Sequence, residues 1–126
     1  MNLEKVVFGF FILLAATLNF GFVYGDMANP EVHEPWELFA AVAVSLVAAV
    51  LKFGDRTHVG AVHLASSLVA LLQLVAAMVV WVVASPADGQ LSPSATASVV
   101  SLAAGALVAN IVSVVIMVIE TTVQRR

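Results

Sequence analysis

The segment VGAVHLASSLVALLQLVAAMVVWVVA, residues 59–84, decides the fold class. It contains no Asp, Glu, Lys or Arg. At about 1.5 Å of rise per residue, a helix of this length is long enough to cross the roughly 30 Å of hydrocarbon in a bilayer. The segment therefore predicts a transmembrane helix.

Three more apolar runs flank this segment, and they predict helices over residues 6–24, 36–53 and 98–123. Pro30 and Pro35 interrupt the chain before the second run, Gly54 and Asp55 end it, and a stretch rich in Ser, Pro and Gly, residues 85–97, precedes the last. Connections this short make consecutive helices antiparallel neighbours. The sequence predicts an all-α membrane protein: residues 1–126 form one domain, an antiparallel bundle of four transmembrane helices.

The composition supports a membrane location and excludes several classes of function. The chain of 126 residues is 62% hydrophobic and only 10% charged, with a mean hydropathy of +1.07, whereas soluble domains are about 25% charged. Its net charge of -3 and five scattered basic residues give no basis for binding nucleic acid. Without cysteine it has no disulfide framework and no thiolate ligand for a metal.

The sequence carries none of the common catalytic signatures, so we expect no enzyme activity, no cofactor and no metal site. No nucleophile elbow, phosphate-binding loop, HExxH pattern or EF-hand loop occurs. His58 and His63 are five residues apart, which on a helix separates them by about 140° and prevents both from binding one ion.

The basic residues predict the orientation in the membrane. All five fall on the side that the two termini share with the loop at residues 54–58, and the positive-inside rule puts that side in the cytoplasm. The expected protein is therefore a multi-pass membrane protein, N-in and C-in, with the bacterial inner membrane as the expected location. The aromatic residues Tyr24, Trp36 and Trp81 fall near the opposite interface. The basic residues are Lys5, Lys52, Arg56, Arg125 and Arg126.

Several uncharged polar residues fall inside the predicted spans and are the candidate pore or packing residues. Gln73 and Asn110 both fall near the bilayer midplane, where their amides would bond to each other between helices or between subunits. Such groups either hold a bundle together or line a path for a solute, and the sequence leaves both interpretations open. The candidates are Asn19, His63, Ser66, Gln73, Asn110 and Ser113.

Small residues at four-residue spacing predict two helix-packing stripes, because helices in lipid associate through close contact of small side chains. One stripe lies in the last span and the other in the second. They consist of Ser101, Gly105, Ala109 and Ser113, and of Ala41, Ser45 and Ala49.

Charged residues gather on both sides of the predicted bundle. The outer loop carries an acidic cluster that would concentrate cations, although solvation alone also explains it. On the cytoplasmic side we expect Glu120 to lie near Lys52 and Arg56, as a salt-bridged lid. The outer cluster comprises Asp26, Glu31, His33, Glu34 and Glu37, and the cytoplasmic cluster comprises Lys52, Asp55, Arg56 and Glu120.

Two partial resemblances to transport families end at specific residues. The run GFVYGD, residues 21–26, resembles the Thr-Val-Gly-Tyr-Gly-Asp filter of potassium channels. The match is partial, because Val23 replaces the first glycine of the filter and Phe22 stands before it. The family also needs a pore helix and an earlier transmembrane helix before the filter, and this sequence predicts neither. The length and helix number resemble the small multidrug resistance transporters. That family requires a membrane-embedded glutamate in its first helix, and here no acidic residue lies between Lys5 and Asp26.

Three hypotheses for function follow. The first is a homo-oligomeric channel or conduit for a small cation, with membrane lipids as its surroundings. The second is a non-catalytic accessory or regulatory subunit of a larger membrane complex. The third is a proton-coupled transporter, which would have to use His63 as its titrating group.

Overall fold

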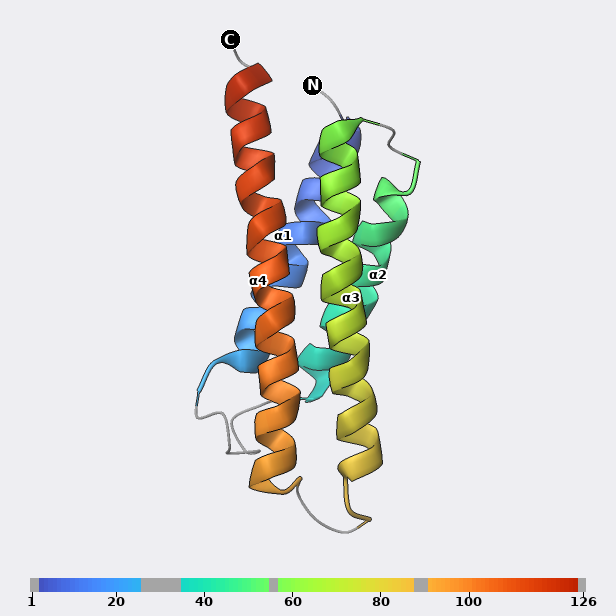
Figure 1. Ribbon diagram of the computed structural model, residues 1–126, viewed down its shortest axis with the longest axis vertical. Coiled ribbons are helices and arrows are strands. Elements are labelled where there is room, and N and C mark those ends of the chain that lie inside the picture. Colours follow the sequence, from blue (N-terminus) through green and yellow to red (C-terminus); the bar gives the residue numbers. More distant parts are fainter. Residues whose placement is uncertain (1–2, 26–34, 55–56, 88–90, 125–126) are drawn as a thin grey trace.

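The computed structural model describes residues 3–25, 35–54, 57–87 and 91–124, with the side chains of residues 121, 123 and 124 outside that description. It contains four helices: α1 (Leu3–Val23), α2 (Pro35–Lys52), α3 (His58–Ala84) and α4 (Pro93–Gln124) (Figure 1). Each helix is long and apolar enough to cross a membrane. The predicted all-α, four-helix transmembrane fold is confirmed, and the chain is a multi-pass membrane protein.

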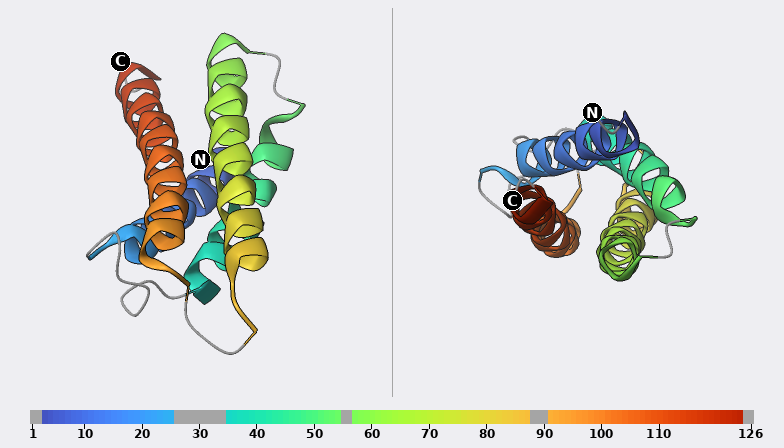
Figure 2. Two further views of the ribbon diagram at one scale, coloured as in Figure 1. Left: turned by 60° about the horizontal axis from the view of Figure 1, so that its bottom comes forward. Right: turned by 90° about the horizontal axis from the view of Figure 1, so that it is seen from above.

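The helices pack in a closed order around a shared interior. Each helix contacts the next along the chain, and α4 returns to contact α1. Seen along the bundle, the four helices surround one central region (Figure 2, right). The start of α1, the end of α2, the start of α3 and the end of α4 lie toward the top of Figure 1. We call this the N/C end, and the opposite end the far end.

The main difference from the predicted boundaries is at the start of α4, which begins at Pro93 and not at residue 98. Proline is favoured in the first helical turn, where its missing N–H costs nothing. Ser92 caps this turn, because its hydroxyl accepts a hydrogen bond from the backbone N–H of Ala95 at 3.2 Å. The capping signal therefore extends the helix into polar sequence that had been assigned to a loop.

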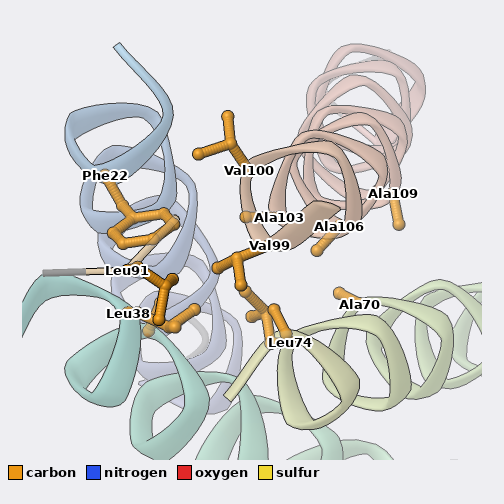
Figure 3. Packing of buried hydrophobic residues seen from close by; sticks show 12 residues of the cluster. Phe22, Leu38, Ala70, Leu74, Leu91, Val99, Val100, Ala103, Ala106 and Ala109 are labelled. Carbon is orange, nitrogen blue, oxygen red and sulfur yellow. The ribbon is translucent and has the colours of Figure 1, made fainter. Parts of the chain in front are cut away.

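The far half of the bundle holds the main apolar core. Phe22, Leu38, Leu74 and Val99 bring one large side chain from each helix into it, and Figure 3 shows them with the alanines between the helices. The ring of Phe22 also contacts the edge of Trp81, with centroids 6.0 Å apart. Alanines at the helix contacts allow close approach, which is the main source of packing energy in lipid. The buried alanines of this cluster are Ala41, Ala70, Ala77, Ala103, Ala106 and Ala109.

The predicted packing stripes are correct on α2 and partly wrong on α4. Ala41, Ser45 and Ala49 are all buried. On α4, Ser113 is buried but Ser101 is exposed. The buried face of α4 follows alternating spacings of three and four residues, as a 3.6-residue helix requires, so a strict spacing of four drifts off that face.

Leu74→Ala should lower the free energy of unfolding of the bundle by about 2 kcal/mol. This value is at the low end for buried leucines, because the unfolded state in lipid already shields the side chain from water. Leu74 is fully buried, whereas Leu72 on the same helix is 71% exposed. The measurement is unfolding in mixed micelles, with Leu72→Ala as the matched control. Equal losses for the two variants would contradict the packing described here.

Candidate functional site

A pocket opens into the bundle at the N/C end. Its volume is about 360 Å³, and side chains from all four helices line it. The lining combines charged, aromatic and aliphatic groups, unlike the interior of the far half. The lining residues are Lys5, Val6 and Phe8 of α1, Lys52 of α2, His63 of α3, and Met117, Val118, Glu120 and Thr122 of α4.

Opposite charges join α1 and α4 at this pocket. Lys5 Nζ donates to Glu120 Oε2 at 2.9 Å, in a pair that is partly exposed. The sequence predicted Glu120 beside Lys52 and Arg56. Glu120 and Lys52 do line the same pocket, but the ion pair forms with Lys5, because α4 packs against α1. Asp55 and Arg56 lie outside the described residues.

Lys52 lies in the last turn of α2 and is only 5% exposed, which is unusual for a lysine. Its Nζ lies 4.3 Å from the centroid of the Phe8 ring, a cation–π arrangement. The same ring also contacts His63, whose ring meets it edge-on with the centroids 4.9 Å apart. Lys52, Phe8 and His63 thus form a cluster of contacting side chains from three helices, and all three line the pocket.

A level of hydroxyl groups follows about 10 Å deeper, counted by helix rise from Lys52. It contains Ser45, Ser67 and Ser113, each almost fully buried. The hydroxyls of Ser66 and Ser113 hydrogen-bond between α3 and α4. Because Ser66 already donates to the His63 carbonyl at 3.1 Å, Ser113 is the donor in this bond.

Three amide side chains lie deeper still. Asn19 and Asn110 are at most 1% exposed, and neither the amide oxygen nor the amide nitrogen of either one bonds to a described residue. Gln73 lies against Gly105, where an added Cβ would collide with its amide. The predicted Gln73–Asn110 hydrogen bond is therefore absent within the chain, because Gln73 meets α4 five residues away from Asn110.

Two of these buried hydroxyls were not among the predicted site residues. Ser67 follows His63 by one helical turn, and Ser45 precedes Lys52 by two turns. These spacings place each serine on the same helix face as its charged or titratable neighbour. The signals that could have identified them are the interval of seven residues between Ser45 and Lys52 and the interval of four residues between His63 and Ser67.

The far end of the bundle has fewer candidate functional residues in the described part of the chain. Asp26, Glu31, His33 and Glu34 of the predicted acidic cluster lie outside the described residues. Glu37 lies in the first turn of α2, where its carboxylate packs on Gly21 of α1. A second pocket near this end has an entirely apolar lining, as a surface against lipid would have. It is formed by Phe39, Met78, Val79, Val82 and Val83.

Comparison with known proteins identifies a family. The chain matches no curated protein and no solved structure. One family model matches residues 32–121, which include all of α2 and α3 and most of α4. The match spans well over half of the chain, so the protein belongs to the family of unknown function DUF6394.

Proposed function

We propose that this protein is a small membrane conduit for a monovalent cation, with a polar path inside the four-helix chain. One observation carries the proposal: buried oxygen atoms without hydrogen-bond partners among the described residues lie on all four helices, from the serine level below the N/C pocket to Asn19 in the far half of α1. These atoms are the amide oxygens of Asn19, Gln73 and Asn110 and the hydroxyl oxygens of Ser45 and Ser67.

The chemistry of these atoms favours a cation. Unpartnered buried polar groups are costly, by about 1–3 kcal/mol each, so a structure retains them where they bind something. Neutral carbonyl and hydroxyl oxygens replace the hydration shell of a small cation. Among the described residues, the buried amide nitrogens without a partner are those of Asn19 and Asn110, against five oxygens. Acceptors therefore exceed the groups that can only donate.

The location of these residues changes the expected geometry of the path. Asn19, Ser45, Ser67 and Asn110 are buried inside one chain, which supports a path within the chain in place of one along an axis between subunits. A homo-oligomer stays part of the proposal as an assembly of several such conduits. The apolar core of Phe22, Leu38, Leu74 and Val99 closes the far half, and such constrictions gate by excluding water.

The test is potassium and chloride flux into liposomes that contain the full-length protein. We expect potassium flux, reduced about tenfold or more in Asn110→Leu, because a hydrogen-bonding group that faces a charge contributes about 1.5–3 kcal/mol. Ser101→Ala is the matched control on the same helix, since Ser101 is exposed.

Three results would contradict the conduit. They are chloride flux in place of potassium flux, equal flux in Asn110→Leu and wild type, or no flux from protein that is folded by circular dichroism. The last result would favour the accessory subunit, the second hypothesis from the sequence.

We also propose that the N/C end faces the cytoplasm. Lys5 and Lys52 lie at this end, and no lysine or arginine occurs in residues 57–124, which form α3, its connection to α4, and α4. The aromatic residues Tyr24, Trp36 and Trp81 lie toward the far end, as anchors at the outer interface would. Positive charge on the cytoplasmic side is the strongest known determinant of orientation.

The chain has no cysteine, so single cysteines can report on orientation without background. Gly54 and Ala87 are exposed at opposite ends of the bundle. In intact cells, a membrane-impermeant maleimide should label Ala87→Cys and should label Gly54→Cys only after permeabilisation. The reverse pattern would overturn the proposed orientation.

A further inference from the structure

We propose that one monovalent cation binds, without its hydration shell, between Ser45 of α2, Ser67 of α3 and Asn110 of α4. The three residues are each 1% exposed, and their side-chain oxygens have no hydrogen-bond partner among the described residues. This inference rests on the proposed conduit, because it names the place in the path where the ion is held. Its test is equilibrium binding, which needs no flux.

A contact between α3 and α4 places Ser67 and Asn110 at similar heights. The two helices run in opposite directions (Figure 1), and the hydrogen bond between Ser66 and Ser113 joins them. Counted by helix rise from this pair, Ser67 lies about 1.5 Å and Asn110 about 4.5 Å farther toward the far end. The two residues are therefore within about 3 Å of each other along the bundle axis.

The ring of Phe8 gives the height of Ser45 in the same way. Lys52 and His63 both contact this ring, so the two residues are at one level. Ser45 lies about 10 Å from Lys52 toward the far end, and Ser67 lies about 6 Å from His63 in that direction. All three proposed ligands thus lie within about 5 Å along the axis, which is also the separation of two oxygens on opposite sides of one cation.

The hydroxyls of Ser45 and Ser67 differ from others in the helices. A hydroxyl inside a helix commonly donates to the carbonyl three or four residues before it. The hydroxyls that do so here are those of Thr17, Ser66, Thr96, Ser98 and Thr122. Thr96 is fully buried, so burial does not prevent this bond. Ser45 and Ser67 make no such bond, and their oxygens are left for an occupant.

The fourth helix leaves room between these oxygens. Lys5 and Glu120 pair at the N/C end, and Ala15 and Asn110 are each ten residues farther into the bundle. Ala15 therefore lies level with Asn110. It is fully buried, and it adds only a methyl group. It belongs neither to the far apolar core nor to the small apolar cluster around Phe8, so apolar packing is interrupted at this level.

The chemistry of the ligands favours a monovalent ion. Hydroxyl and amide oxygens are neutral, and neutral oxygens can replace the hydration shell of a monovalent cation. Divalent ions are bound mainly through carboxylates. In the described part of the chain, no three or more His, Cys, Asp and Glu side chains form a group that could hold a metal ion.

Binding of radioactive rubidium, which replaces potassium, to the full-length protein in detergent tests the inference. We expect one rubidium ion per chain, displaced by potassium but not by choline, whose methyl groups keep oxygen ligands away from its charge. Ser45→Ala and Ser67→Ala should each weaken binding about tenfold or more, because each removes a ligand of the ion. Ser98→Ala is the matched control, since Ser98 is exposed and donates to its own helix.

A further variant separates the loss of a ligand from damage to the fold. Asn110→Asp keeps the shape of the side chain, and at alkaline pH it should place a negative charge against the cation. Rubidium should then bind more tightly than it does to the wild type. Damage to the fold would instead weaken binding in this variant as well as in the two serine variants.

The outcomes distinguish the site from the conduit. No bound rubidium in the wild type would mean that this level holds water alone, and the proposed site would be wrong. Equal binding in the wild type and both serine variants, or weaker binding in Asn110→Asp at alkaline pH, would also overturn it. Binding without potassium flux would support the site and contradict the conduit, whereas flux without binding would contradict the site alone.

Discussion

Hydrocarbon cannot form hydrogen bonds, and this single property of the solvent determines where each side chain of the bundle lies. Large apolar side chains such as Leu72 and Val83 face outward, with 71% and 78% of their surface exposed. Asn19, Asn110 and Ser67 are buried, because a polar group that faces lipid would lose every partner. These uncharged polar side chains of the spans therefore lie inside the bundle beside an apolar core, while large apolar side chains cover its outer surface.

The same constraint divides the interior into two unlike halves. In the far half, large side chains such as Phe22 and Leu74 fill the space between alanines, and the core is apolar. Toward the N/C end, serines and the charged pocket take over, with only a small apolar cluster around Phe8 and Ile12. A protein that needed only to hold four helices together could use the alanine-based packing throughout. The polar half is thus the part that the fold alone does not explain.

The spans could be predicted from sequence because crossing a bilayer depends on composition and length, which are local properties. The start of α4 could not, because Ser92 and Pro93 cap a turn within sequence that is as polar as a loop. The partner of Glu120 also could not. Lys5 is 115 residues away along the chain, and only the α1–α4 contact brings the two together. Of the polar candidates in the spans, Asn19, His63, Asn110 and Ser113 are buried and two are half-buried, Ser66 and Gln73. Helix rotation decides which polar groups face the interior of the chain, and the sequence alone does not give it.

Electrostatics connects the pocket to the buried oxygens. Lys52 and Ser45 are seven residues apart on α2, about 10 Å along the axis. At that distance and an effective dielectric constant of about 20, two unit charges interact by about 1.7 kcal/mol. The energy of a cation at the serine level therefore depends on the combined charges of the pocket above it, those of Lys5, Lys52 and Glu120.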